Sequence, residues 1–269
     1  MARAEQALDR MLALDALAAR PGDPGYRNPM AHLLVTLAFI VAVLSFDRYT
    51  VAALMPLALF PMALAAQARV PAALLVRTVG LALPFAVMVG LFNPLLDRSP
   101  MLQLAGLQLS GGWVSLASIV LRVALTVSAT LVLVAGTGLP ALCSALARLG
   151  VPQVLTVQLL LLYRYLFVLA GEAARMDTAR RLRAAWQPRL ALSTYASLLG
   201  QLLLRSVERA QRLHQAMRVR GYSGQWPTAP RPWQLADTVF VLGWLVFFAL
   251  ARAVDLPLAM GQVLVGLAP

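Results

Sequence analysis

Apolar runs long enough to cross a lipid bilayer constrain this chain more than any other feature of its sequence. A helix that crosses the hydrocarbon core needs about 20 predominantly apolar residues. Runs of this length lie at residues 72–92, 113–136 and 235–253. Two shorter runs, 33–46 and 51–66, flank a polar stretch and predict a hairpin that is either tilted or placed in a locally thinned bilayer. The expected fold is all-α: a polytopic helical membrane protein with about five transmembrane helices.

Composition supports a membrane protein and excludes several functions. The chain is 60% hydrophobic and 13% charged, far from the balance of a soluble domain. Its 23 basic residues outnumber 11 acidic ones, but a nucleic-acid binder carries such charge on a soluble scaffold with a groove-reading element, so we expect no nucleic acid as partner. All 23 are arginine. Without lysine the chain has no GxxxxGK[ST] phosphate loop, so a partner must hydrolyse any nucleotide.

Residues that commonly bind metals or cofactors are few and scattered. The chain has one cysteine, Cys143, and two histidines, His32 and His214, at distant positions that match no metal-ligand spacing. We therefore expect neither a bound metal nor a cofactor. Residues 1–32 mix four arginines with four acidic residues and predict an N-terminal cytoplasmic segment rather than a secretory signal.

Two arginines interrupt the predicted spans. Arg77 lies in the 72–92 run and Arg122 in the 113–136 run. Both lie within about two turns of a helix end, from which a long side chain reaches the membrane interface. We therefore expect both arginines to snorkel.

Positive charge is concentrated in one segment, residues 137–233. It holds 13 arginines against three acidic residues, so 10 of the 12 net positive charges lie there. Basic flanks of membrane helices remain on the cytoplasmic side, which predicts a cytoplasmic coupling domain with two long amphipathic helices. The remaining segments are transmembrane helices 1–4 at 33–136, with the 93–112 loop outside, and a C-terminal transmembrane segment at 234–269.

Two apolar stripes of helical spacing run through this cytoplasmic segment. The first runs through Leu155, Leu159, Leu162, Leu166, Leu169, Ala173 and Met176 to Arg183, and the second through Leu199, Leu203, Ser206, Ala210, Leu213 and Met217 to Arg220. At an offset of 37 residues the two stripes match, with Arg183 aligned on Arg220. Gly221 then predicts the end of the second helix. Each long helix thus carries an arginine on the apolar stripe at its far tip.

An arginine on an apolar stripe has three interpretations. It can simply mark a basic helix end favoured by the helix dipole, or bind anionic lipid head groups. It can also bind carboxylates of a partner through bidentate, charge-assisted hydrogen bonds. Two arginines in matching context, followed by the small residues Ala184 and Gly221, favour docking on a partner.

These residues resemble the transmembrane T component of energy-coupling-factor importers, and within it the CbiQ type of the cobalt systems. That family carries two Ala-Arg-Gly type signatures at the ends of two cytoplasmic coupling helices. The matching triplets are Leu182, Arg183 and Ala184, and Val219, Arg220 and Gly221. Each departs from the pattern at its first position, and the first triplet also at its third. The stretches LGVP at 149–152 and YRNPMAH at 26–32 are similar to the family too, with His32 at a commonly basic position.

The resemblance implies a non-catalytic coupling subunit in the bacterial cytoplasmic (inner) membrane. Its implied partners are a pair of CbiO-like cytoplasmic ABC ATPases and a CbiM-like substrate-binding membrane subunit, with or without a CbiN-like small subunit, besides membrane lipid. The two signature triplets would dock on the ATPases. The neighbours that would support the two coupling helices are Arg180, Arg181, Met217 and Arg218.

Other transporters share parts of this pattern. The T component of a nickel or vitamin system would have the same architecture. A conventional ABC importer permease docks through an EAA loop, and residues 172–174 read Glu-Ala-Ala, but Thr178 stands where that loop needs glycine. A secondary transporter would carry an inverted repeat, whereas the repeat found here is cytoplasmic. A membrane-anchored assembly protein without transport is the remaining alternative.

Overall fold

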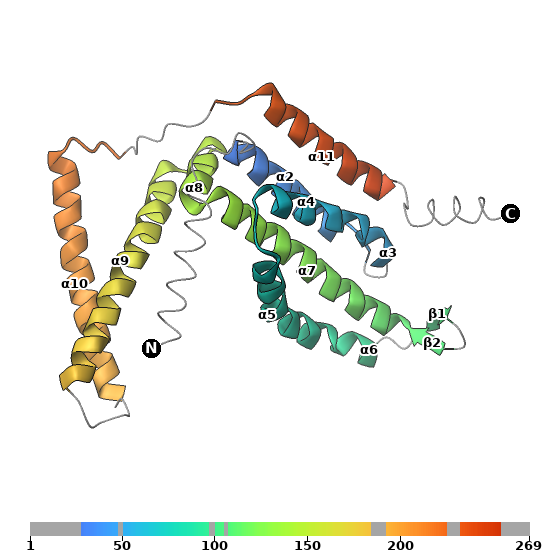
Figure 1. Ribbon diagram of the computed structural model, residues 1–269, viewed down its shortest axis with the longest axis horizontal. Helices are drawn as coiled ribbons and strands as arrows, with labels where there is room; N and C mark the ends of the chain where they lie inside the picture. The colour runs from blue at the N-terminus through green and yellow to red at the C-terminus, as the bar shows by residue number, and fades with distance from the viewer. Residues whose placement is uncertain are drawn as a thin grey trace. The chain divides into compact units, whose positions relative to one another are not determined.

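The computed structural model describes residues 28–47, 51–96, 100–104, 107–183, 192–224 and 232–253 (Figure 1). Helices α8, α9 and α10 form one compact unit, and all other described elements form a second. We call them the arginine-rich unit and the apolar unit. The predicted all-α polytopic membrane fold is confirmed, apart from one short antiparallel hairpin in the 93–112 loop. Its strands are β1 (Pro100–Leu104) and β2 (Leu107–Ser110).

The apolar unit consists of short and long apolar helices. In chain order they are α2 (Pro29–Leu44), α3 (Val51–Leu54), the 3-10 turn η1 (Pro56–Ala58), α4 (Leu59–Gln67), α5 (Ala72–Gly90), α6 (Phe92–Leu96), α7 (Gly111–Thr137) and α11 (Leu235–Ala253). The region around α5 and helices α7 and α11 are long and apolar enough to cross a membrane. With 16 residues α2 is about 24 Å long, less than the hydrocarbon thickness of about 30 Å.

Helices α2 and α11 pack in parallel along their whole length. At their start, the backbone N–H of Asn28 donates to Asp237, and the rings of His32 and Phe240 are 5.2 Å apart. Further along, the rings of Phe39 and Phe248 are 5.5 Å apart. At the far end, the Arg252 guanidinium lies 5.0 Å from the centre of the Phe46 ring. These contacts advance together along both helices, so the two helices begin on the same side of the unit.

Aromatic side chains fill the centre of the apolar unit. Phe60 of α4 is fully buried and lies 4.6 Å from Phe39, 4.9 Å from Trp244 and 5.3 Å from Phe248, measured between ring centres. The Trp244 and Phe248 contacts are edge-on, the geometry that the ring quadrupoles favour. This cluster joins α2, α4 and α11 at one point.

Arg122 corrects one expectation from the sequence. It does not snorkel: its guanidinium donates to the backbone carbonyls of Phe46 and Asp47, at 2.8 and 2.6 Å, and to the Ser118 hydroxyl at 3.2 Å. The last carbonyls of a helix have no partner within that helix. Arg122 of α7 therefore binds the chain just beyond the C-terminal end of α2. Arg77, by contrast, is exposed on α5.

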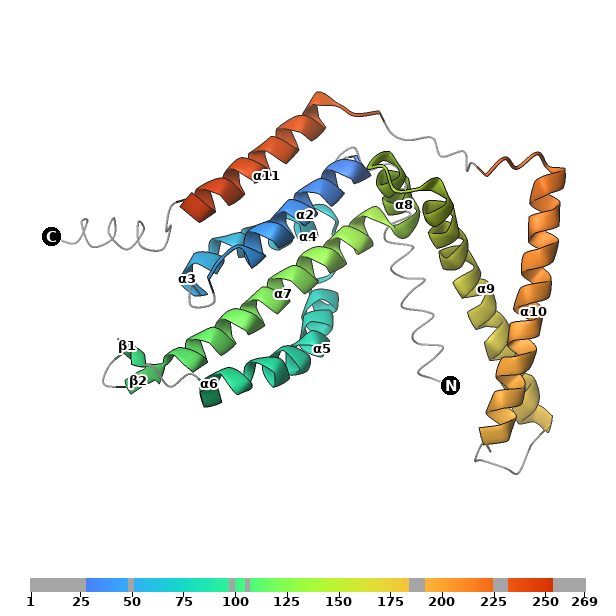
Figure 2. The same ribbon diagram turned by 180° about the vertical axis from the view of Figure 1, so that it is seen from behind.

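The arginine-rich unit consists of α8 (Leu139–Arg148), α9 (Gln153–Arg183) and α10 (Leu192–Val219). Gly150 ends α8 with a φ of +93, and the N–H of Val151 bonds back to the carbonyl of Leu146 at 3.2 Å. This is a Schellman cap, and Pro152 follows it to begin the turn into α9. The LGVP stretch is thus a helix-to-helix turn. Helix α10 runs back in the opposite direction to α9 (Figures 1 and 2).

Candidate functional site

The first signature lies at the last turn of α9. Arg183 is the final residue of the helix and is exposed, as is Leu182, whose side chain is 79% accessible. Ala184 lies outside the described residues. The preceding basic residues Arg180 and Arg181 both bind the carboxylate of Asp177, at 3.0 and 3.1 Å. They hold the last turn together, whereas Arg183 has no ion-pair partner in the described part of the chain.

The second signature ends α10. Gly221 has a φ of +76, and its N–H donates to the Arg218 carbonyl at 3.0 Å, while the N–H of Tyr222 donates to the Met217 carbonyl at 2.9 Å. This Schellman cap confirms that the helix ends at Gly221. Residues with a side chain rarely adopt such a φ. The cap therefore holds Arg220, and Val219 at 89% accessibility, on an exposed end.

The two signatures lie at opposite ends of the helix pair, because α9 and α10 run in opposite directions (Figure 1). A 28-residue helix such as α10 is about 42 Å long. Two other arginines on these helices are paired with acids of their own helix: Arg175 with Glu172 at 2.7 Å, and Arg212 with Glu208 at 3.7 Å. Among the described residues, Arg183, Arg218 and Arg220 near the tips have no such partner, and neither do Arg164 and Arg209 further along the helices. The free charges at the tips are therefore available to a partner.

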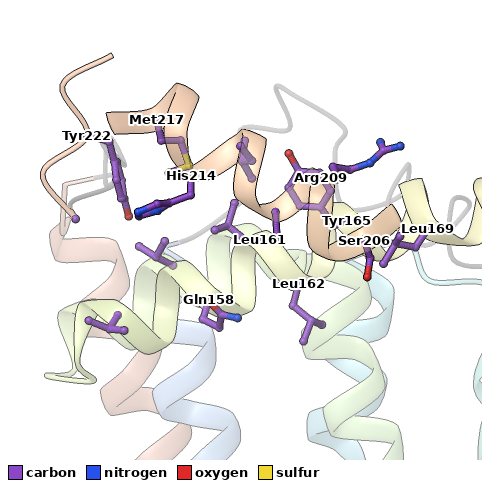
Figure 3. A pocket seen from close by; sticks show the side chains of 15 residues that line it. Gln158, Leu161, Leu162, Tyr165, Leu169, Ser206, Arg209, His214, Met217 and Tyr222 are labelled. Carbon is purple, nitrogen blue, oxygen red and sulfur yellow. The ribbon is translucent and has the colours of Figure 1, made fainter. Parts of the chain in front are cut away.

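A groove of about 590 Å³ separates the N-terminal half of α9 from the C-terminal half of α10 (Figure 3). Apolar side chains dominate its walls, among them Val157, Leu161, Leu213 and Met217. Tyr165, Arg209, His214 and Tyr222 add polar groups. Met217, which the sequence places both on the apolar stripe and beside the second signature, lines this groove. Arg218 is exposed beside it.

The stripe predicted for α9 is only partly correct. Leu162 and Leu169 of that stripe line the groove, whereas Leu155, Leu159 and Leu166 do not and are 42–55% accessible. The groove is lined mainly by a neighbouring stripe that includes Val154, Val157, Leu161 and Tyr165. The N-terminal half of α9 is apolar on most of its circumference, so periodicity alone did not select its packed face. On α10 the predicted residues Ser206, Ala210, Leu213 and Met217 do line the groove.

Sequence reasoning missed an acidic residue inside a predicted span. Asp237, in the first turn of α11, is 3% accessible and accepts hydrogen bonds through both carboxyl oxygens. It lies three residues after Gln234 at a helix start and makes the reach-back bond of a capping box, although Gln234 and Asp237 do not match the usual sequence pattern of that motif. Nothing local in the sequence indicated its second contact, with Asn28.

Within the described ranges, no three His, Cys, Asp or Glu side chains lie close enough together to bind a metal ion. Cys143 is buried in α8, and burial raises the pKa of its thiol.

Comparison with known proteins gives concordant matches. A family model described as cobalt transport protein, CbiQ, matches residues 26–231. The cobalt transport protein CbiQ of Salmonella typhimurium is 31% identical over 159 residues, which cover 54% of this chain and 70% of that protein. The protein of the same name from Rhodobacter capsulatus is 40% identical over 85 residues, 31% of this chain and 35% of that protein. The family match spans the elements from α2 to α10 and stops before α11.

Proposed function

This chain belongs to the CbiQ family of cobalt transport proteins, and from that membership we propose that it is the coupling subunit of an energy-coupling-factor importer for cobalt. In the proposed complex, the arginine-rich unit docks on a pair of cytoplasmic ABC ATPases. The apolar unit contacts a separate membrane subunit that captures the metal. The chain transmits the movement of the ATPases and leaves ATP hydrolysis to them, in keeping with its lack of a P-loop lysine.

The position of Arg183 and Arg220 carries this proposal. Both are exposed, both lack an ion-pair partner in the described chain, and they mark opposite ends of an antiparallel helix pair. Two docking points at opposite ends of the helix pair suit two ATPase subunits, with one subunit bound at each tip. An arginine of this kind recognises carboxylates with defined geometry through its planar, five-donor head group.

The direction of the helices supports a cytoplasmic position for the arginine-rich unit. Because α2 and α11 run in parallel, an odd number of crossings must connect them. The α3–α4 segment, α5 and α7 supply three. Helix α9 is also long and apolar enough to cross. A single additional crossing by α9, however, would make α11 begin on the opposite side of the membrane from the start of α2. We therefore propose that α8, α9 and α10 stay on the cytoplasmic side, where their arginines favour them.

Co-purification from the native host tests the proposal directly. A tagged chain, extracted in mild detergent, is expected to retain two copies of an ABC ATPase and one metal-binding membrane protein, identified by mass spectrometry. Reconstituted in liposomes, this complex should accumulate Co(II) only when ATP is present. Isolation of the chain without an ATPase under conditions that preserve other membrane complexes would reject the coupling role.

A further inference from the structure

The start of α11 is fastened to the start of α2 by one buried carboxyl group. Oδ2 of Asp237 accepts the N–H of Gln234 at 3.0 Å, which is the reach-back bond of a capping box within α11. Oδ1 accepts the N–H of Asn28, the N-cap of α2, at 3.1 Å. Asp237 therefore performs the same capping task for two helices at once. Negative charge is also favoured at both sites by the helix dipoles.

Neighbouring residues add further contacts at the starts of α2 and α11. The Asn28 side chain accepts the N–H of Met30 at 3.1 Å and so caps its own helix. One turn further, the His32 and Phe240 rings meet edge to face at 5.2 Å. We call Asn28, His32, Gln234, Asp237 and Phe240 the clasp. It gives a physical role to the NPMAH part of the 26–32 stretch, which the docking function does not explain.

The clasp lies where the chain returns from the arginine-rich unit. That unit ends at residue 230, and the described chain resumes at residue 232, two residues before Gln234. The chain also connects the two units between the end of α7 and the start of α8. The end of α7 is tightly packed, because a Cβ on Gly136 would lie 2.9 Å from Cβ of Ala68. Movement passed along the chain from residue 230 thus reaches the apolar unit first at the clasp.

We propose that the clasp is the fixed anchor through which movement of the arginine-rich unit is transmitted to the apolar unit, and that Asp237 is its positioning residue. This inference rests on the proposed coupling function. With the clasp intact, displacement of residues 232–234 moves α11 and α2 together. With the clasp open, the same displacement only unwinds the first turn of α11, and ATP is hydrolysed without transport.

Asp237→Asn in the complete complex tests the inference. The amide is the same size, but it replaces one accepting oxygen with an NH₂ group that faces a backbone N–H. One of the two bonds is therefore lost. We expect the ATPases to remain bound and at least half of their activity to persist, while the Co(II) transported per ATP hydrolysed falls at least threefold. Phe240→Leu, which preserves apolar bulk, should lower the same ratio and decides the matter if Asp237→Asn does not assemble.

Gly112→Ala is the matched control for general damage to the apolar unit. A Cβ there would lie 2.4 Å from Cα of Pro94, far from the clasp, so this variant should lower the melting temperature without changing the transport ratio. An unchanged ratio in the clasp variants, or an equal fall in Gly112→Ala, overturns the inference. A wild-type chain that binds no ATPase rejects the proposed function instead, and the two failures are thus distinguishable.

Discussion

Glu172 of α9 and Arg205 of α10 form an ion pair across the two long helices, with 2.5 Å between Oε1 and NH1. The Glu172 carboxylate also binds Arg175 on its own helix. The pair lies at the closed end of the groove, since the groove residues of α9 precede Glu172 and those of α10 follow Arg205. It therefore joins the two helices beside the end of the groove.

Glu172→Gln is expected to loosen this helix pair. The neutral amide keeps the size of the side chain but loses the attraction to Arg205. Spin labels at positions 158 and 213, on opposite walls of the groove, should give a broader distance distribution by pulsed electron paramagnetic resonance. Glu208→Gln is the control, because the partner of Glu208 is Arg212 on the same helix. Equal broadening in both variants would show that the ion pair between Glu172 and Arg205 does not hold the two helices together.

Neutralising the two tip arginines should separate the chain from its ATPases. Loss of one partner from a desolvated charge pair at an interface costs about 2–5 kcal/mol, or roughly 30- to several-thousand-fold in affinity. Arg183→Gln with Arg220→Gln should therefore abolish co-purification while the membrane helices remain folded.

The control for the tip arginines removes the same number of charges. Arg175 and Arg212 are 69% accessible and already paired with acids of their own helices, and such surface pairs contribute little. Arg175→Gln with Arg212→Gln should keep most of the bound ATPase, as measured by quantitative pull-down. Full ATPase binding by the tip variant would mean that Arg183 and Arg220 are ordinary basic helix ends.

Both tips should be accessible from the cytoplasm. Leu182 and Val219 are the most exposed apolar residues at the two ends, so each is replaced by cysteine in a Cys143→Ser background. A membrane-impermeant maleimide should label both in inverted vesicles and neither in intact spheroplasts. Labelling of Leu182→Cys from the outside would mean that α9 crosses the membrane and would refute the topology.

Arg122→Met should destabilise the apolar unit. It leaves the carbonyls of Phe46 and Asp47 without their donor, and hydrogen bonds to a charged group contribute about 1.5–3 kcal/mol each. We expect a fall of several degrees in melting temperature in detergent, with partial recovery in Arg122→Lys. Arg77→Met, at an exposed position of α5, should have little effect. If Arg122 snorkelled instead, Arg122→Met and Arg77→Met would both leave the melting temperature nearly unchanged.

Local patterns in the sequence determined which segments became helices. Apolar runs predicted the long helices of the apolar unit, because burial in lipid or in a core requires such runs whatever their neighbours. The end of α10 at Gly221 was equally predictable, since a Schellman cap depends on one glycine and its adjacent backbone groups. The internal repeat likewise identified both tip arginines from the sequence alone.

Tertiary structure decided the long-range partners. Asn28 and Asp237 are 209 residues apart, and Arg122 and Phe46 are 76 apart, so no periodicity of the chain indicates that either pair meets. The packed face of α9 was equally undetermined, because a helix that is apolar on most sides has no single face to select. In each case the free energy of the contact arises only when separate helices come together. A local sequence pattern therefore cannot predict it.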